Sequence, residues 1–400
     1  MRSIQSNPSV KRRTLLLGMV GTVAQFAGCG GGGSDVAGLS SGGTGSFTSG
    51  TISGLGSIIV NGIRYNDDNA TLISRDDGSS FGDTLRVGMV VSIQGSSVTA
   101  ASTANGTATA TAYRISCDSE WEGPVSNVGA SSFDMLGLTV DVLATTVFEG
   151  AATQLTGLST SHFVEVHGYV DQITGRLQAS RVEVSATAPA AYKLSGVVHS
   201  WDGINSTFKL GASTQLSNQI NWNTSTLTPT NWSDGVFVRV KMTAALLATQ
   251  IRVLSSPLTQ LSADDERDAE IHGFISAFVS VSDFTVNGIP VNASTARIAG
   301  GTLALGVRVE IHGSVSNGVL IATKVETPSN TDVATREFEF HGTVSNWNAS
   351  THTFELHGLT FGYAPGISVQ GVTMADGVRI EIKATRTSGA WLATEIRADD

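Results

Sequence analysis

Gly273-Phe-Ile-Ser276 is one of five copies of a short pattern, Gly-x-(Ile/Val)-(Ser/His), that recurs along this chain. Successive copies are 73, 73, 77 and 69 residues apart. Self-similarity at a nearly fixed period indicates an array of similar folded units and argues against a single large domain. The five copies are Gly50-Thr-Ile-Ser53, Gly123-Pro-Val-Ser126, Gly196-Val-Val-His199, Gly273-Phe-Ile-Ser276 and Gly342-Thr-Val-Ser345.

Three further landmarks follow each copy in the same order. The second is Phe-x-(Leu/Val/Met)-x-Gly, as in Phe284-Thr-Val-Asn-Gly288. The third is Leu-x-x-Gly followed by a short alternating run, as in residues 303–313, and the fourth is Ala-x-x-(Ile/Val), as in Ala322-Thr-Lys-Val325. The third copy shortens the second landmark, and the second copy places Ser161 where the third landmark has Gly. An order kept through five copies predicts one shared fold for all of them.

The landmarks are typical of strands and turns. Val307, Val309 and Ile311 alternate with polar residues, so one face of the predicted strand is apolar and the other polar. Glycines on either side of such runs mark turns or bulges. Each unit is therefore expected to hold five or six short antiparallel strands in a small barrel or sandwich, with one short helical turn before the third landmark.

We predict an all-β chain with a tandem array of five small antiparallel β-barrel (OB-like) modules. Units of this size bury only about 60% of their unfolded surface, so they should pack against their neighbours in a nearest-neighbour array. The expected segments are a lipoprotein signal peptide at 1–29, a flexible Gly/Ser tether at 30–46, and modules at 47–118, 119–187, 192–256, 267–328 and 336–400.

The N-terminal residues resemble an export signal. The cationic residues Lys11, Arg12 and Arg13 precede an apolar stretch that is too short for a membrane-spanning helix. The stretch ends in Phe26-Ala-Gly-Cys29, which resembles the bacterial lipobox, although Phe26 replaces the usual Leu. The resemblance implies cleavage before Cys29 and lipid attachment to its sulfur, palmitate included; the alternative is an ordinary cleavable signal. The twin arginines leave both the Sec and the twin-arginine routes open.

Charge and cysteine content narrow the function classes. The chain has a net charge of −10, and loss of the four cations before Cys29 leaves 20 basic and 34 acidic residues. Nucleic-acid binding depends on phosphate neutralisation by Lys and Arg, so we expect no nucleic-acid partner. With Cys29 assigned to lipid attachment, Cys117 is interpreted as a small buried apolar residue.

The six tryptophans and eight histidines are candidate binding residues. All six tryptophans align with apolar positions of other copies, which favours core packing over an exposed aromatic platform for glycans. His167, His272, His312 and His341 align with Lys, Gln, Glu or Ser, which favours a solvated strand face, although His341 and His357 could meet across strands. Acidic runs at 66–69 and 264–266 lack calcium-loop spacing. We therefore expect no metal site and no cofactor.

No familiar catalytic motif is present. The sequence lacks a Gly-x-Ser-x-Gly elbow, a phosphate-binding P-loop and a dinucleotide fingerprint. A catalytic group would also have to stand out as a departure in one copy, and we find no such departure. We expect no enzymatic activity and no catalytic residues.

The four landmarks together resemble a bacterial domain-of-unknown-function module that occurs in tandem in envelope lipoproteins. Residues 273–325 show the resemblance most fully, and the third copy departs most, with Met242 at the closing Gly. The resemblance spans nearly all of residues 47–400 and implies a small β-barrel and an envelope setting, without an assigned activity.

The sequence thus predicts a lipid-anchored protein of the bacterial cell envelope, at the outer membrane or facing the periplasm. We expect a non-catalytic binding or scaffold protein with an envelope protein or glycan as partner, and with edge strands, module seams and loops as contact surfaces. The alternatives are an extracytoplasmic glycan-binding protein and, third, a hydrolase of envelope polymers.

Overall fold

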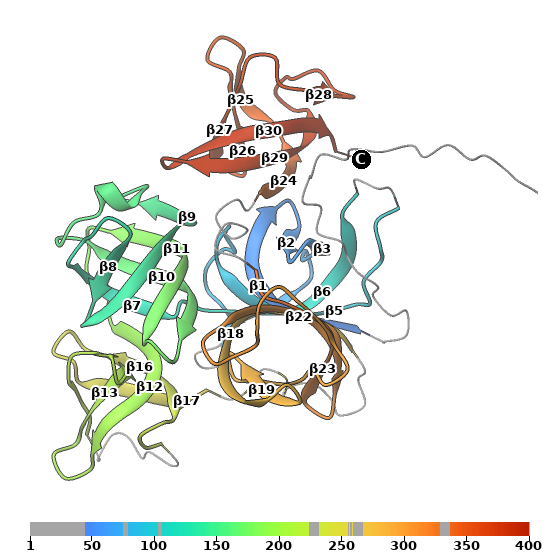
Figure 1. The fold of residues 1–400 in the computed structure, drawn as a ribbon. Helices are drawn as coiled ribbons and strands as arrows, with labels where there is room; N and C mark the ends of the chain where they lie inside the picture. The colour runs from blue at the N-terminus through green and yellow to red at the C-terminus, as the bar shows by residue number, and fades with distance from the viewer. Residues whose placement is uncertain are drawn as a thin grey trace, which may run out of the picture. The chain divides into compact units, whose positions relative to one another are not determined.

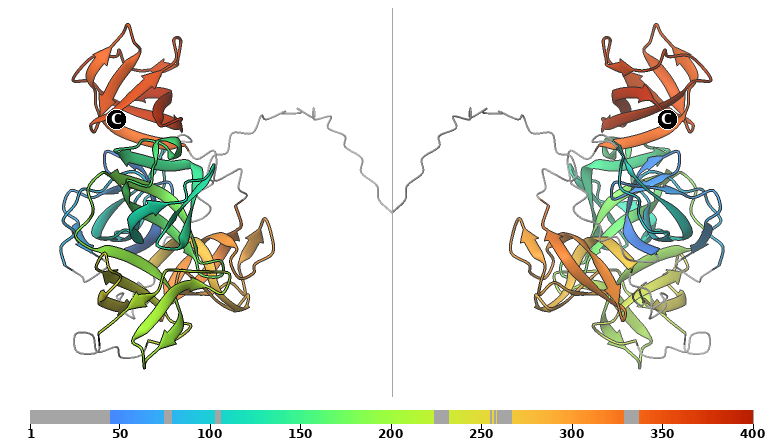
Figure 2. Two further views of the ribbon diagram at one scale, coloured as in Figure 1. Left: turned by 90° about the vertical axis from the view of Figure 1, so that its left-hand side faces the viewer. Right: turned by 90° about the vertical axis from the view of Figure 1, so that its right-hand side faces the viewer.

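The structure, a computed structural model, describes residues 45–74, 79–102, 106–223, 232–254, 256, 258, 267–328 and 337–399, all within one compact unit, Val36–Asp400. Its described elements are thirty β-strands and one short 3-10 turn, which confirms the all-β prediction (Figure 1). The strands of each barrel can be followed by colour in the two side views of Figure 2. Among the described residues there is no helix with the length and apolar character needed to cross a membrane.

The first module is a closed barrel whose strands pair in the order β1-β2-β3-β6-β5-β1. All of these pairs are antiparallel except β3 with β6, which run parallel. β4 follows β3 along the chain and, like β3, pairs parallel to β6. The strands are β1 (Gly45–Leu55), β2 (Ile58–Val60), β3 (Ile63–Asn66), β4 (Thr71–Ser74), β5 (Val90–Gly95) and β6 (Ala108–Cys117).

The second, fourth and fifth modules close in the same order, and in each the last strand pairs parallel to the third part of the barrel: β9 with β11, β20 and β21 with β23, and β27 and β28 with β30. Alternation of apolar residues does not reveal strand direction, so the sequence did not distinguish this pair. The second module has β7 (Trp121–Ser126), β8 (Ser132–Met135), β9 (Leu138–Gly150), the predicted helical turn η1 (Leu155–Gly157), β10 (Phe163–Asp171) and β11 (Arg176–Ser185). The fourth has β18 (Arg267–Ser280), β19 (Asp283–Val286), β20 (Ile289–Asn292), β21 (Arg297–Ala299), β22 (Arg308–Ser316) and β23 (Val319–Glu326). The fifth has β24 (Phe338–Thr343), β25 (Ser345–Asn348), β26 (Thr353–Leu356), β27 (Leu359–Tyr363), β28 (Val369–Gln370), β29 (Arg379–Thr387) and β30 (Ala390–Ala398).

The third module departs from the others at its parallel contact. There the contact is reduced to an isolated bridge between Asn221 and Leu247. This agrees with the shortened second landmark of the third copy. Its strands are β12 (Tyr192–Asp202), β13 (Thr207–Ala212), β14 (Gln215–Leu216), β15 (Ile220–Asn221), β16 (Phe237–Met242) and β17 (Ala248–Val253).

In four barrels the second landmark forms the turn of a β-hairpin, namely β2–β3, β8–β9, β19–β20 and β26–β27. Both central residues of each turn have positive φ, as in Asn287 (49°) and Gly288 (80°). This is the type I′ geometry that matches strand twist in a two-residue hairpin. The same pair of positive angles occurs at residues 61–62, 136–137 and 357–358.

The third landmark returns the chain to the first. The backbone N–H of Gly306 donates to the carbonyl of Ile275, the apolar residue of the first landmark, at 2.8 Å. Gly88, Gly235 and Gly377 make the same bond in their barrels. All four glycines have positive φ, whereas Ser161 in the second barrel does not. In these four barrels the third landmark is thus hydrogen-bonded to the first.

Neighbours in space are not always neighbours in sequence. β1 of the first barrel pairs parallel to β18 of the fourth and also to β24 of the fifth, while β12 of the third meets β7 of the second. The nearest-neighbour expectation is therefore wrong for the first barrel. The physical reason is the length of β1, which has 11 residues: residues 45–49 lie beyond its pairing with β2, and Gly54 and Leu55 lie beyond its pairing with β5, so their free backbone edges pair with other strands.

Candidate functional site

The predicted cysteine and acidic positions fall into two groups. Cys29 and the run 264–266 lie outside the described residues. Cys117 is buried, with 1% exposure, as predicted. The run 66–69 is a turn, in which the backbone N–H of Asp68 donates to the side chain of Asn66 at 3.2 Å.

The tryptophan prediction is confirmed for most positions. Trp121, Trp222, Trp232 and Trp391 are buried in barrel cores. Trp347 is half-buried, and Trp201 is wrong as a core residue because 42% of it is exposed. Its ring instead packs edge-on against Trp232 at 6.3 Å from the outer side of the core.

The prediction that the histidines lie on a solvated strand face is wrong for three of them. His167, His272 and His341 are each at most 5% exposed. All three lie on the outer face of a barrel, at the strand pairs β7–β10, β18–β22 and β24–β29. Charged side chains and neighbouring strands cover them there. His312 is half-buried, and the exposed His357 donates a ring N–H to the carbonyl of His341 at 2.7 Å.

His341 of β24 is the centre of a cluster of ionisable side chains. Its Nε2 lies 2.8 Å from Glu339 Oε1, and its Nδ1 lies 2.9 Å from Asp399 Oδ1. Burial alone would lower the pKa of His341, but these two hydrogen bonds raise it above its ordinary value. Burial would likewise raise the pKa of Glu339 and of Asp399, but their bonds to His341 lower both. The arrangement therefore favours an imidazolium held between two carboxylates.

This cluster is the one place where the described side chains approach the geometry of a metal site. Ligand atoms of Glu339, His341 and Glu381 all lie within 4.8 Å of one another. However, Arg397 bonds Glu381, and Arg379 and Arg64 face Asp399. Three guanidinium groups thus balance the three carboxylates, and both ring nitrogens of His341 are engaged. The donor set fits an ion-pair network better than a divalent cation.

The shifted pKa values predict how the stability of the fifth barrel changes with pH. The raised pKa of His341 stabilises the folded barrel below about pH 6.5, and this stabilisation is lost as pH rises through the folded-state pKa. The lowered pKa of Glu339 stabilises the folded barrel above about pH 4.5, and that stabilisation is lost as pH falls. We expect His341→Asn to cost about 2 kcal/mol at mildly acidic pH and to flatten the loss of stability on going to alkaline pH. Hydrogen exchange of the β24 and β29 amides, corrected for intrinsic rates, measures this. His199→Asn in the third barrel is the control, and an unchanged pH profile in His341→Asn would contradict the assignment.

The fourth barrel carries a related cluster of His and Glu side chains, in which the pKa values are shifted in other directions. His272 lies 3.2 Å from Glu270 and 3.6 Å from Glu310, and His312 lies 3.6 Å from Glu270. Burial and the charge of Glu310 hold the pKa of Glu270 well above its usual range. Burial and Lys324 lower the pKa of His312. Burial therefore disfavours the charged forms of Glu270 and His312, whereas hydrogen bonds favour the charged forms at His341.

A third polar network joins the second and third barrels. Glu120 accepts a hydrogen bond from Ser195 Oγ at 2.6 Å and from Arg239 Nη2 at 2.7 Å. The indole N–H of Trp121 donates to the carbonyl of Ser195 at 2.8 Å, and Lys193 donates to Ser119 at 2.9 Å. The seam between the second and third barrels is thus filled by buried polar contacts.

Sequence reasoning missed these networks, although one signal was present. Glu-x-His-Gly occurs five times, at 165–168, 270–273, 310–313, 339–342 and 355–358, and two of these, 270–273 and 339–342, overlap the first landmark of the fourth and fifth copies. Strand residues two apart share a face, so each Glu and His had to be neighbours. The cross-strand partners could not be assigned without the register.

Comparisons with known proteins agree with the repeat. A family described as a domain of unknown function (DUF5666) matches residues 47–111, 122–183, 272–326 and 333–397, and the third barrel lies outside these matches. A search of curated proteins gives no match. Among solved structures, one similar chain is the Drosophila Unr CSD456, with 12% sequence identity and a TM-score of 0.13, over 53% of this chain and 98% of that one.

Proposed function

Because the chain belongs to the DUF5666 family, whose function is unknown, we propose that it is a non-catalytic binding or scaffold protein of the bacterial cell envelope, held at the membrane by lipid on Cys29. We further propose that its modules are OB-like, which the closure order 1-2-3-5-4-1 supports. Lipid attachment rests on the sequence Phe26-Ala-Gly-Cys29 alone.

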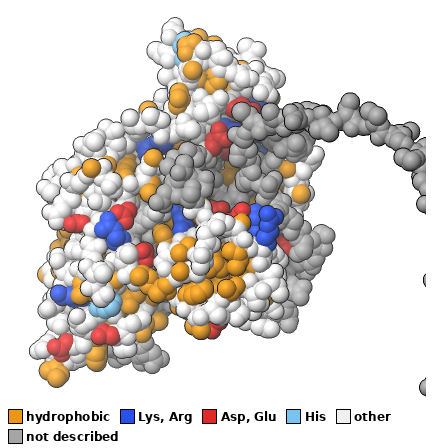
Figure 3. Space-filling view, in the orientation of Figure 1, with side chains coloured by type: hydrophobic (Ala, Val, Ile, Leu, Met, Phe, Trp, Pro, Cys, Tyr) orange, Lys and Arg blue, Asp and Glu red, His pale blue; other side chains and the backbone are white. Residues whose placement is uncertain are grey.

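The observation that carries a binding role is an exposed apolar patch on the fourth barrel. Figure 3 shows hydrophobic side chains gathered over this barrel on the face that it draws. The large apolar side chains that this barrel exposes are Val279 (77%), Val281, Ile298 and Leu305 (46%), and we name them the fourth-barrel patch. Exposed apolar side chains that gather on one face of a soluble domain mark interaction sites. A protein partner in the envelope would cover it.

The patch can be tested by capture from native envelopes. We expect Val279→Asp together with Leu305→Asp to abolish crosslinking of the partner that the wild-type chain retains, since two charges in an apolar contact are costly. Ile204→Asp is the matched control, because Ile204 of the third barrel is 95% exposed and lies outside the patch. Mass spectrometry of the crosslinked products measures the effect. Equal capture by both variants would refute a role for the patch.

The anchor enters the same experiment as a separate arm. Cys29→Ser removes the sulfur to which lipid would be attached, so this variant should leave the membrane fraction while retaining the partner in solution. A chain that stays in the membrane fraction without Cys29 would remove the lipid anchor from the proposal and leave the binding role standing.

Glycan binding is the second candidate, favoured by two equivalent tryptophans. Trp201 and Trp347 lie at the same place in the third and fifth barrels, and each backbone N–H donates to an Asp side chain at 2.8 Å. Trp347 Nε1 also contacts Tyr363 Oη at 3.3 Å. Partly exposed aromatic faces on polar supports are suited to sugar stacking. Retention on polysaccharide that is lost in Trp201→Ala and Trp347→Ala would favour this reading.

A further inference from the structure

A cavity of about 400 Å³ lies within the described unit, where residues of the first four barrels come together. We name it the four-barrel cavity. Its lining includes Arg114 of β6, Tyr169 of β10, Arg239 of β16 and Thr285 of β19. This volume falls in the range of about 300–1,000 Å³ typical of small-molecule sites. No single module forms the cavity, so it is a property of the assembled array.

Positive charge is concentrated in this cavity, although the chain as a whole is acidic. Arg114, Arg239 and Arg252 line it together with one carboxylate, Glu120, whereas the chain has a net charge of −10. The Arg239 side chain is only 3% exposed and is oriented by its bond to Glu120. The Nε of Arg114 is buried and has no hydrogen-bond partner among the described residues. A buried guanidinium donor that lacks an acceptor, such as Arg114 Nε, indicates a site for an anion.

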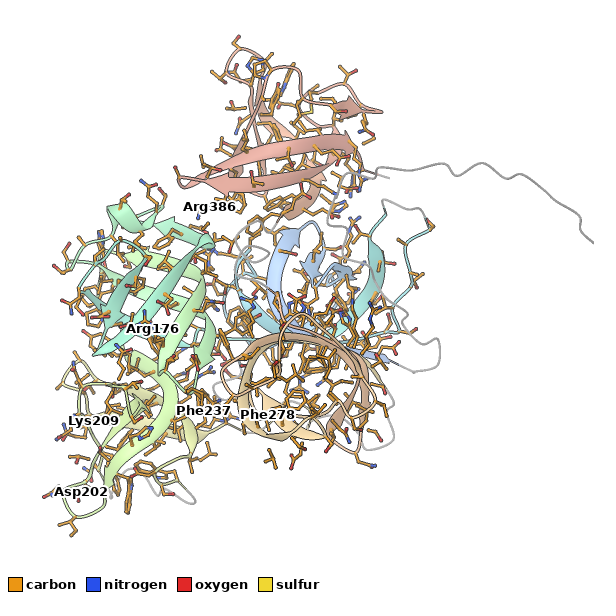
Figure 4. All side chains as sticks on the ribbon, in the orientation of Figure 1. Arg176, Asp202, Lys209, Phe237, Phe278 and Arg386 are labelled. Carbon is orange, nitrogen blue, oxygen red and sulfur yellow. The ribbon has the colours of Figure 1, made fainter. Side chains whose placement is uncertain are left out.

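The rest of the lining combines flat apolar walls with small polar groups. Phe237 provides a ring surface and is labelled on β16 in Figure 4. Ser92, Ser116 and Gln94 supply hydroxyl and amide groups. An inorganic anion would contact the arginines alone, whereas a hydroxylated organic anion would also contact the hydroxyl and amide groups and the apolar part of the lining.

We propose that the four-barrel cavity binds a small hydroxylated organic anion, with the arginines holding its carboxylate or phosphate and the Ser and Gln side chains its hydroxyl groups. A sugar acid and a sugar phosphate share this chemistry. Guanidinium groups pair with either anion through two parallel hydrogen bonds, which gives orientation as well as attraction. The site is separate from the fourth-barrel patch, so either can fail without the other.

Calorimetric titration of the full chain in detergent tests the proposal with glucuronate, a hexose monophosphate and glucose as probes. We expect at least one anion to bind more than about tenfold more tightly than glucose, and the tighter anion identifies the source. Arg114→Gln should weaken that binding by about tenfold or more, because it removes a charged donor. Ala277→Trp should block entry, because Ala277 lines the cavity and is exposed.

The control removes the same charge elsewhere. Arg297→Gln, at an exposed position of the fourth barrel outside the cavity lining, should bind as the wild type does. The proposal is overturned if glucose binds as tightly as the anions, if Arg114→Gln and Ala277→Trp both keep wild-type affinity, or if neither anion binds at millimolar concentration.

Discussion

Arg239→Met is expected to destabilise the joined second and third barrels by about 3–5 kcal/mol, because it leaves the carboxylate of Glu120 buried without its guanidinium. The two side chains are 3% and 12% exposed, and their atoms are 2.7 Å apart. Methionine keeps the length of the side chain and its apolar contacts, so the loss of stability is due to the missing positive charge. Urea unfolding combined with hydrogen exchange of the β7, β12 and β16 amides measures it.

Two further variants separate a buried pair from charge loss in general. Glu120→Gln combined with Arg239→Met removes both charges and should recover most of the lost stability, since replacing both partners of a buried pair costs far less than removing one. Arg176→Met in the second barrel breaks the Arg176–Asp141 pair, whose side chains are 38% and 36% exposed, and should cost less than about 1 kcal/mol. Figure 4 labels Arg176. Additive losses in the double variant would show that the pair does not couple the two barrels.

The fold could be predicted from sequence because each landmark performs one local task. Asn287-Gly288 makes a type I′ turn, and Gly306 fastens the third landmark to Ile275 of the first. Both tasks require residues that accept positive φ, so Gly recurs at fixed places and is visible without structure. The parallel strand pair was not visible, because it depends on a crossover between distant strands and leaves no local residue signature.

The polar networks could be predicted only in part. Positions that hold His in one copy and Lys, Glu or Ser in another were interpreted as solvated, since such exchange is typical of surfaces. In the structure His341 is buried by partners that its own copy supplies, Glu339 and Asp399. Each copy has its own partner set, so variation between copies reflects different buried networks and not exposure.

Trp201 shows the opposite error. Its alignment with Leu55 and Val128 predicted a core position, yet Val128 is itself 37% exposed. Trp201 lies at the end of β12 (Tyr192–Asp202), next to the hairpin that follows it. The Cβ of a residue at Gly203 would lie 2.7 Å from the Trp201 ring, so the hairpin tip also depends on Trp201 being folded over it.

Phe340→Ala is expected to destabilise the fifth barrel by about 3–5 kcal/mol, through lost burial and the cavity left behind. Phe340 is fully buried, and its ring centroid lies 4.8 Å from that of Phe361 and 5.3 Å from that of Trp391 in edge-on geometry. The aligned positions Trp121, Leu194 and Ile271 are also buried to 1% exposure or less, so every one of these barrels closes over this residue. Calorimetry of the full chain, with hydrogen exchange of β24 and β30 to assign the transition, measures the loss.

The chain itself offers the control for this prediction. Leucine stands at the aligned position 194 of the third barrel, so Phe340→Leu should cost less than about 1.5 kcal/mol, because the volume change is small and the surrounding rings can adjust. Strand pairing between β1 and β24 then predicts that Phe340→Ala also speeds exchange of the Gly54 and Leu55 amides, while the third barrel, whose described strands pair with neither, is unaffected. If β24 loosens and β1 does not, the first and fifth barrels unfold independently, and their pairing makes no contribution to the stability of the array.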